Sequence, residues 1–250
     1  MVSLPALDAF WQGRQAHFWF WTSPATEPDE PRPEQLALLS DAESARAGRF
    51  RSDSARRLFV CARSQLRRTL GAYLSEDSRR VVIDVEPSGK PVLGGPHRGR
   101  LGFSLAHTSG CVALLAAAGS RRLGADVEGR SRRPDVDGIA RRYFAEEEAA
   151  RLARLDEPDR VEAFRRLWTL KEAFAKARGD GLGPVLRTVV VPWTEPGRGP
   201  LQVTLRPAEE AALFDWQFGI AEDLAEFTLA YAIERRGDPP LELRVLDGNA

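Results

Sequence analysis

Two carboxylates, Asp126 and Glu128, are separated by one residue in the run Leu123-Gly-Ala-Asp126-Val-Glu128. The run predicts a β-strand, and because side chains alternate between the faces of a strand, both carboxylates project to the same side. Their Cα atoms then lie about 7 Å apart, where the charges repel unless a cation or hydrogen-bond donors lie between them. Oxygen ligands of this kind suit Mg²⁺. Half-exposed strands often carry the same pattern without binding anything, so the pair alone does not establish a metal site.

A third carboxylate, Glu172, lies between an aromatic residue and a cation on a predicted helix. Trp168, Glu172 and Lys176 recur every four residues, which places them on one helix face. The simpler interpretation is an exposed Glu–Lys pair that contributes roughly a few tenths of a kcal/mol. The Trp on the same face instead favours a packed surface, with Glu172 and Lys176 partly buried. The run Gly179-Asp-Gly181 is typical of a helix end.

Lysine is rare in this chain, because Lys and Arg together number 36 and only Lys90, Lys171 and Lys176 are lysines. An ammonium is a compact point charge whereas a guanidinium is planar, so positions that keep Lys are candidates for close contact with phosphate oxygens. Codon bias with chance survival of three lysines explains the composition equally well. Lys90 lies between the flexible Gly89 and the stiff Pro91, which suits an ammonium held against a phosphate.

His107 and Thr108 end a predicted strand, just before the turn that contains Ser109 and Gly110. A His can change charge near neutral pH, and a Thr hydroxyl can donate to a phosphate oxygen. A lone His is more often structural, so these two residues gain weight only in combination with other motifs.

The order of predicted elements gives two similar α+β halves. Strands are expected at residues 17–22, 81–85, 101–107, 111–118, 123–128, 185–191, 201–205, 214–220 and 226–233, and helices at 40–50, 53–74, from about 144, and through 168–178. The shorter helix of the first half begins with the capping box Ser40-Asp-Ala-Glu43. A loop is expected over 87–99 and a polar linker over 129–137. We therefore predict halves at 1–120 and 121–235 with a ligand cleft between them, and a partly disordered tail at 236–250.

The composition favours a soluble cytoplasmic protein. Apolar residues make up 43% of the 250 positions, enough to bury a core without disulfides or structural metal. Cys61 and Cys111 each lie among apolar residues without metal-ligand spacing, which indicates core thiols in a reducing compartment. The longest apolar run, 112–118, is too short to span a bilayer. A formal net charge of zero argues against broad attraction to nucleic acid or anionic membranes.

In combination, the motifs carry more weight than any one of them. Their order is Gly89-Lys90-Pro91, Phe103-Ser-Leu-Ala-His107-Thr108, Gly124-Ala-Asp126-Val-Glu128 and Trp168-x-x-Lys171-Glu172-Ala-x-x-x-Lys176. This order resembles the 4′-phosphopantetheinyl transferases of the larger, surfactin-synthetase-activating type. The resemblance covers residues 36–182 by motif, and the element order agrees to residue 233.

The resemblance implies an α+β fold of two halves related by a pseudo-two-fold, with the active site between them. It implies Mg²⁺-dependent transfer of phosphopantetheine from coenzyme A to a serine of an apo acyl or peptidyl carrier protein, with release of 3′,5′-ADP. Mn²⁺ is a possible substitute for Mg²⁺. The implied protein is a monomer with no nucleic-acid or membrane partner.

By position, the resemblance assigns roles to individual residues. Asp126, Glu128 and Glu172 match the metal ligands, and Glu172 also matches the general base, acting directly or through a metal-bound water. Lys176 matches a contact to the diphosphate, and it is grouped with Glu172 and His107 as catalytic. The residues that match the pocket for adenine and the 3′-phosphate are Gly89, Lys90, Pro91, His107, Thr108 and either Arg56 or Arg63.

Two positions depart from the family pattern. Ala106 stands where a Ser commonly precedes the His, so any phosphate contact there is left to the backbone or to Thr108. Ala145 stands where a Ser or Thr commonly caps a helix, which should weaken that cap by about 1 kcal/mol.

Two other functions remain open on the sequence. A coenzyme A-binding sensor, or a degenerate homologue without transferase activity, would keep the pocket, although the intact set of Asp126, Glu128 and Glu172 argues against it. A Mg²⁺-dependent nuclease that uses the arginines is disfavoured by the neutral net charge. The sequence does not identify which carrier proteins are modified.

Overall fold

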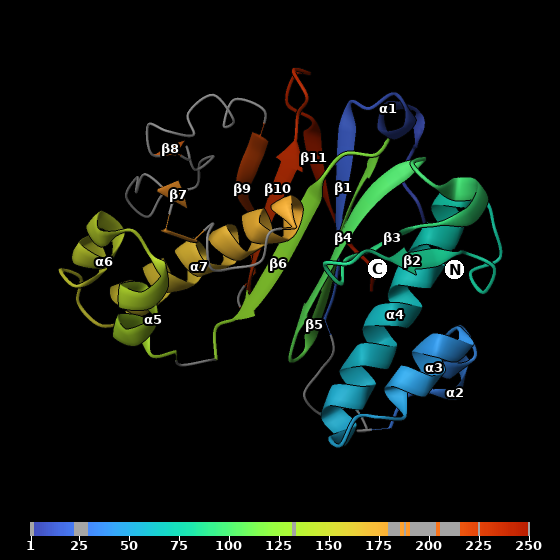
Figure 1. Ribbon diagram of the computed structural model, residues 1–250, viewed down its shortest axis with the longest axis horizontal. Helices are drawn as coiled ribbons and strands as arrows, with labels where there is room; N and C mark the ends of the chain where they lie inside the picture. Colours follow the sequence, from blue (N-terminus) through green and yellow to red (C-terminus); the bar gives the residue numbers. More distant parts are fainter. Residues whose placement is uncertain are drawn as a thin grey trace.

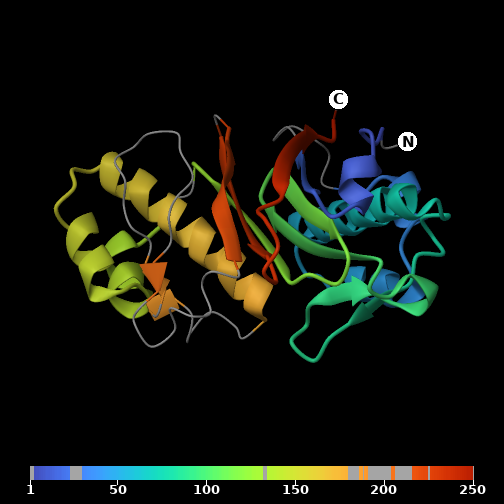
Figure 2. The same ribbon diagram turned by 90° about the horizontal axis from the view of Figure 1, so that it is seen from above.

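Two β-sheets lie back to back between two long helices in the computed structural model (Figures 1 and 2). The first sheet has the strand order β11 (Glu242–Asp247), β1 (Gln15–Thr22), β5 (Cys111–Ala118), β4 (Leu101–Thr108), and helix α4 (Asp53–Leu74) covers its outer face. The second sheet has the order β6 (Leu123–Gly129), β10 (Phe227–Glu234), β9 (Trp216–Asp223), and helix α7 (Asp159–Arg178) covers it. The expected mixed α+β class is confirmed.

The structure describes residues 3–22, 30–131, 134–179, 186–187, 189–190, 204–205, 216–224 and 226–249. The shorter helices within them are α1 (Asp8–Trp11), α2 (Pro33–Leu36), α3 (Asp41–Ala47), α5 (Val136–Tyr143) and α6 (Glu146–Leu152). Two small hairpins pair β2 (Ile83–Val85) with β3 (Pro91–Leu93) and β7 (Val189–Val190) with β8 (Thr204–Leu205). None of the described helices is long and apolar enough to cross a membrane.

Alternation along the strands divides the core into layers. On β5, Val112 and Leu114 pack beneath α4, whereas Ala113 and Leu115 face the second sheet. That middle layer also contains Ala125 of β6, so one continuous apolar core joins the two sheets. The sheets are therefore held face to face by packing, and β4 and β6 lie next to each other along one side of the sandwich (Figure 1).

Several sequence predictions are confirmed. Ser40 accepts a hydrogen bond from the Glu43 amide, and Glu43 accepts one from the Ser40 amide, as a capping box requires. Helix α4 spans 53–74 as expected, and β9 and β10 form the expected antiparallel hairpin. At the end of α7, Gly179 has φ of +81°, the left-handed conformation that glycine favours in a C-cap.

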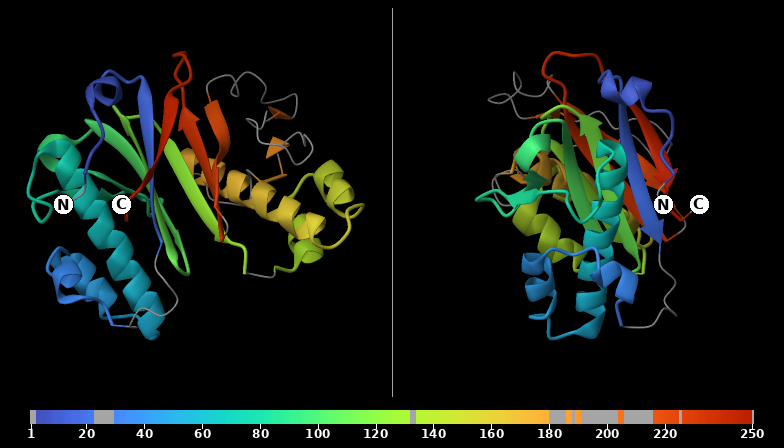
Figure 3. Two further views of the ribbon diagram at one scale, coloured as in Figure 1. Left: turned by 180° about the vertical axis from the view of Figure 1, so that it is seen from behind. Right: turned by 90° about the vertical axis from the view of Figure 1, so that its right-hand side faces the viewer.

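The tail is a correction. Residues 236–250 were expected to be partly disordered, but Glu242–Asp247 forms β11 and pairs in parallel with β1 (Figure 3). The physical reason is that β1 is otherwise an edge strand with unpaired backbone groups, and β11 satisfies them. The tail thus contributes a strand to the sheet that contains β1, β4 and β5. The domain boundaries at 120 and 235 stay a prediction.

Other differences are local. The strand expected at 81–85 begins at Ile83, and the loop expected over 87–99 contains β3, because Gly89 has φ of +86° and turns the chain back. Helix α5 falls within and beyond the expected polar linker and is not predicted from the sequence. Most of the strands expected at 185–191 and 201–205, and residues 180–181 of the expected helix end, lie outside the described residues.

A buried histidine, His17, is part of an aromatic network beneath α4. Its Nδ1 lies 2.5 Å from the hydroxyl of Tyr73, which also accepts a hydrogen bond from the indole of Trp19 at 2.9 Å. The His17 side chain is fully buried. Burial is the main reason that the pKa of His17 falls from 6.5 to about 4; the charge of Arg244 lowers it further, and Glu242 opposes both.

This lowered pKa predicts that the protein loses stability in mild acid. Unfolded chains bind a proton at His17 near pH 6.5, but the native protein binds it only near pH 4, so the free energy of unfolding falls as the pH drops between these values. Urea unfolding at pH 7 and pH 5 should show a smaller pH effect for His17→Phe than for the wild type. Trp19→Phe, which removes the other hydrogen bond to the Tyr73 hydroxyl without removing a titratable group, is the control and should keep the wild-type pH effect. Equal pH effects in the wild type and His17→Phe would contradict this prediction.

Candidate active site

Helix α7 and strand β6 approach each other closely because Gly124 has no side chain. A Cβ atom at Gly124 would overlap the carbonyl oxygen of Ala173 and lie 2.6 Å from the amide nitrogen of Ala177. Any larger residue would push the helix away from the strand. The motif residue Gly124 therefore places the carboxylates of β6 within reach of the side chains of α7.

The closest polar contact between these elements is an ion pair. The ammonium of Lys176 lies 2.5 Å from Oδ1 of Asp126 and 3.9 Å from Oε2 of Glu172. Asp126 is only 4% exposed. Burial alone would lower the pKa of Lys176, but Asp126, Glu172 and Glu128 outweigh burial and raise this pKa above its ordinary value. Lys176 therefore carries its positive charge among three carboxylates.

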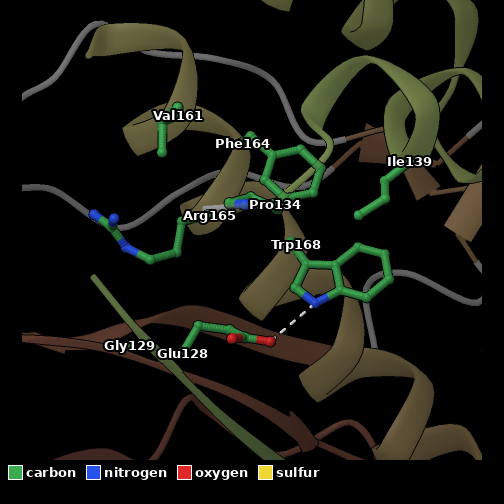
Figure 4. Close-up of a pocket in the computed structure, with 8 residues that line it drawn as sticks. All are labelled: Glu128, Gly129, Pro134, Ile139, Val161, Phe164, Arg165 and Trp168. Carbon is green, nitrogen blue, oxygen red and sulfur yellow. Dashed lines mark hydrogen bonds between the residues drawn. The ribbon is translucent and has the colours of Figure 1, made fainter. Parts of the chain in front are cut away.

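The remaining strand carboxylate, Glu128, is held by the aromatic residue of the helix. The indole Nε1 of Trp168 donates a hydrogen bond of 3.1 Å to Oε1 of Glu128 (Figure 4). A cavity of about 40 Å³ lies beside this pair, and Phe164 and Ile139 contribute to its walls. The expected packed face of Trp168, Glu172 and Lys176 is confirmed, since all three residues are half-buried and both Trp168 and Lys176 contact carboxylates of β6.

The three carboxylates fit a divalent metal by chemistry, although they do not form a ready-made cluster. Among the described residues, no group of three or more His, Cys, Asp or Glu side chains is already arranged to hold a metal ion. The Oδ2 atom of Asp126 is buried and has no hydrogen-bond partner. An orphaned carboxylate oxygen at a buried site is a ligand atom that a hard cation could use. The ammonium of Lys176 provides the positive charge at this place in the structure.

His107, near the end of β4, lies close enough to Asp126 and Lys176 to interact with their charges. Partial desolvation of the imidazole ring is the main reason that the pKa of His107 is lowered. The charges of Lys176 and Arg46 lower this pKa further, and Asp126 opposes them. His107 is therefore neutral at pH 7. The structure thus brings His107 together with the predicted Lys176 and Asp126, and adds Arg46 of α3, to which sequence analysis gave no role.

The two candidate arginines of α4 differ in their partners. Arg63 is paired with Glu43, with 2.5 Å between Nη2 and Oε1, and Arg67 binds the other oxygen of the same carboxylate at 2.6 Å. Glu43 also accepts the capping hydrogen bond of α3, so Arg63 serves a structural network. Nε of Arg56, by contrast, is shielded from water and has no hydrogen-bond partner among the described residues. Arg56 is therefore the freer of the two for an anionic ligand.

Lys90 connects the β2–β3 hairpin to β6 and α7. Its ammonium donates hydrogen bonds to the carbonyl oxygen of Leu123 at 2.7 Å and to that of Lys176 at 3.1 Å. Burial is the main reason that the pKa of Lys90 is lowered. A cavity of about 290 Å³ adjoins Lys90, and its walls include the cationic residues Arg98, Arg121, Arg122 and Arg178. Pro91 is the first residue of β3. Thr108 is the last residue of β4, next to His107, and pairs with Cys111 of β5.

Lys171 precedes Glu172 but faces away from the carboxylates of β6. Its fully buried ammonium lies 2.6 Å from Oε2 of Glu148, donates to the carbonyl of Leu186 at 2.6 Å, and sits 5.0 Å from the centre of the Phe144 ring. Glu148 also accepts from the Ala145 amide, so α6 keeps this cap although Ala145 has no hydroxyl. Lys171 thus fixes α7 against α6.

Comparisons with known proteins identify related enzymes. Residues 122–232 match the family model described as the 4′-phosphopantetheinyl transferase superfamily. The chain is 35% identical over 181 residues to the 4′-phosphopantetheinyl transferase HetI of a Nostoc species, a match that covers 71% of this chain and 76% of that protein. It is 32% identical over 170 residues to a putative 4′-phosphopantetheinyl transferase of a Synechocystis species, with 68% of each chain covered.

A human relative is more distant. The L-aminoadipate-semialdehyde dehydrogenase-phosphopantetheinyl transferase of Homo sapiens is 28% identical over 176 residues, which cover 66% of this chain and 52% of that protein. The matched family region contains Asp126, Glu128, Glu172 and Lys176, the residues that meet between β6 and α7. The chain therefore belongs to the 4′-phosphopantetheinyl transferase superfamily and is an enzyme of the phosphopantetheinyl transferase class.

Proposed function

We propose that this enzyme transfers phosphopantetheine from coenzyme A to a serine of an apo acyl or peptidyl carrier protein, with Mg²⁺ as cofactor and 3′,5′-ADP as the second product. The observation that carries the proposal is the meeting of Asp126, Glu172 and Lys176 between β6 and α7, next to His107 of β4. Carboxylates suit a hard cation, and the cationic side chains around His107 suit a polyanionic ligand.

Asp126, Glu128 and Glu172 are the residues that would hold Mg²⁺ or Mn²⁺. The bound metal would neutralise charge that builds on the phosphate oxygens as the bond to the leaving nucleotide breaks. The buried, unpartnered Oδ2 of Asp126 supports this assignment. In the described structure Lys176 neutralises the same carboxylates, so we propose that Lys176 turns from Asp126 towards the diphosphate when metal and coenzyme A bind.

Glu172 is the proposed general base. Its carboxylate is 17% exposed and lies 3.9 Å from the Lys176 ammonium, which would hold it beside the reacting phosphate. The serine oxygen of the carrier forms the new bond to phosphorus, the bond to 3′,5′-ADP breaks, and Glu172 accepts the serine proton directly or through water. Trp168 keeps Glu128 in place by its indole hydrogen bond.

The nucleotide end of coenzyme A is assigned to the N-terminal half. Neutral His107 can donate a hydrogen bond to a phosphate oxygen, and Arg46 contributes positive charge near it. Arg56, whose Nε has no hydrogen-bond partner among the described residues, is the proposed arginine of this pocket. Lys90, between Gly89 and Pro91 in the hairpin turn, lines the cationic cavity of about 290 Å³, which favours the adenine and 3′-phosphate assignment of that turn. Thr108 can add a hydroxyl donor at the end of β4.

Three finer statements belong to the same proposal. The enzyme is of the surfactin-synthetase-activating type, acts as a monomer, and consists of two halves related by a pseudo-two-fold. Support for the duplication comes from the first-turn glutamates of α3 and α6. Each accepts a hydrogen bond from the N-cap amide of its own helix and pairs with cationic side chains of the long helix that follows. Glu43 binds Arg63 and Arg67 of α4, and Glu148 binds Lys171 of α7.

A transfer assay tests the proposal. The enzyme is incubated with coenzyme A, Mg²⁺ and a purified apo carrier protein, and the carrier is examined by mass spectrometry for the added phosphopantetheine. We expect the modification to depend on the divalent cation and on the carrier serine. Failure with a panel of acyl and peptidyl carriers, together with tight coenzyme A binding, would favour the sensor function instead.

Replacing the base should separate chemistry from binding. Glu172→Gln keeps the shape of the side chain but cannot accept the serine proton, so we expect kcat to fall by about 10²–10⁴. Calorimetry should show coenzyme A affinity within about threefold of the wild type. Glu157→Gln, at an exposed position before the same helix, is the control and should retain full turnover. Full activity of Glu172→Gln would refute the base assignment.

Lys176→Arg tests whether the compact ammonium matters. The planar guanidinium cannot approach both Asp126 and Glu172 in the narrow space between α7 and β6, so we expect kcat/KM for coenzyme A to fall by about tenfold or more. The control is Arg141→Lys, which exchanges the same two residue types in reverse at an exposed position of α5 and should leave turnover unchanged. An unchanged rate in Lys176→Arg would show that any cation serves at this position.

A further inference from the structure

One edge of β6 lacks a partner strand. β6 pairs with β10 along its whole length on one side, but on the other side, for the described residues, β6 and β4 share no backbone ladder. The two strands nevertheless run close together, because a Cβ atom at Gly102 of β4 would lie 2.5 Å from the carbonyl oxygen of Arg121, two residues before β6. Backbone groups at this junction therefore need partners other than a strand.

Two side chains supply those partners. The hydroxyl oxygen of Ser104, on β4, accepts a hydrogen bond of 3.0 Å from the amide of Ala125. The ammonium of Lys90 donates to the carbonyl of Leu123 at 2.7 Å. Leu123 and Ala125 are two residues apart, so both groups point from the same edge of β6. Ser104 and Ala125 are both buried, with exposed fractions of 5% and 0%.

The positions of these contacts connect them to the site. Ser104 lies three residues before His107 on β4, and Ala125 directly precedes Asp126 on β6. Lys90 also donates to the backbone carbonyl of Lys176, whose side chain binds Asp126. The Ser104 contact joins β4 to β6, and the Lys90 contacts join the β2–β3 hairpin to β6 and α7.

We propose that Ser104 and Lys90 are positioning residues that set the register and spacing between β4 and β6, and thereby the placement of His107 relative to Asp126 and Lys176. This inference rests on the proposed function. A ligand whose two ends contact different strands reacts only if those strands keep the right separation, and an error of about 1 Å can cost about 10² in rate. Apolar packing alone holds the sheets together without fixing this register.

The ammonium of Lys90 suits this role better than a guanidinium would. An ammonium has three donors on one atom, and two of them reach carbonyls of different elements, one on β6 and one on α7. A planar guanidinium spreads its donors over a fork and needs more room. The hairpin turn at Gly89 presents Lys90 to this junction.

The test compares two buried serines. Ser104→Ala removes the acceptor of the Ala125 amide, whereas Ser64→Ala removes a buried serine hydroxyl on α4 that donates to the carbonyl of Cys61, away from the junction. Both variants should lose some stability in urea unfolding. We expect only Ser104→Ala to lower kcat, by about tenfold or more, with the KM for the carrier protein within about twofold of the wild type.

Conservative replacements complete the test. Ser104→Thr keeps the hydroxyl and should restore most of the lost kcat. Lys90→Met should lower kcat as Ser104→Ala does, and Lys90→Arg should not restore it. If Ser104→Ala does not fold, the pair of Lys90 variants decides the question, since Lys90 lies at the rim of the cavity.

The possible failures are distinguishable. A wild-type enzyme that modifies no carrier refutes the proposed function. An active wild type in which Ser104→Ala and Ser64→Ala show the same kcat overturns the positioning role and leaves the function standing. Rescue by Lys90→Arg would overturn the part of the inference that concerns the ammonium.

Discussion

The ion pair between Lys176 and Asp126 is the interaction on which the rest of the site depends. Three carboxylates gather where α7 crosses β6, and without a cation between them their repulsion would drive the helix from the strand. Gly124 permits the close approach, and Lys176 neutralises the charge that the approach creates. The raised pKa of Lys176 shows that its neighbours stabilise the charged form despite burial. The carboxylates therefore surround a positive charge, which Lys176 supplies in this structure.

The three lysines of this arginine-rich chain share one physical property. Each ammonium contacts acceptors from two separate segments within a confined space: Lys90 binds β6 and α7, Lys171 binds α6 and Leu186, and Lys176 binds β6 and its own helix. An ammonium carries its three donors on one atom, which suits acceptors that converge on a single point at short range. Phosphate contact is therefore not required to explain Lys171, and for Lys90 and Lys176 it is a further role proposed on top of an observed structural one.

Sequence patterns predicted the features that depend on residues close together in the chain. The capping box at Ser40, the long helix over 53–74 and the shared face of Trp168, Glu172 and Lys176 are set by neighbours in sequence, and the structure confirms them. The pairing of β11 with β1 joins residues more than 200 positions apart and leaves no local pattern, so the tail was predicted wrongly. The engagement of Arg63 by Glu43 and the hydrogen bond from Ala125 to Ser104 likewise arise only when distant elements pack. The family resemblance proposed residues for the site, but the contacts that those residues make could be seen only in the folded structure.

Titration of Mg²⁺ into the protein without coenzyme A tests the central claim most directly, because it measures whether Lys176 and the metal compete for the same carboxylates. Calorimetry should show weak binding to the wild type and binding at least about tenfold tighter to Lys176→Met, since that variant removes the competing charge from Asp126. Adding Asp126→Asn to Lys176→Met should abolish the gain. Binding to Lys176→Met that is no tighter than binding to the wild type would contradict the account, because it would show that the metal does not use the place that Lys176 holds.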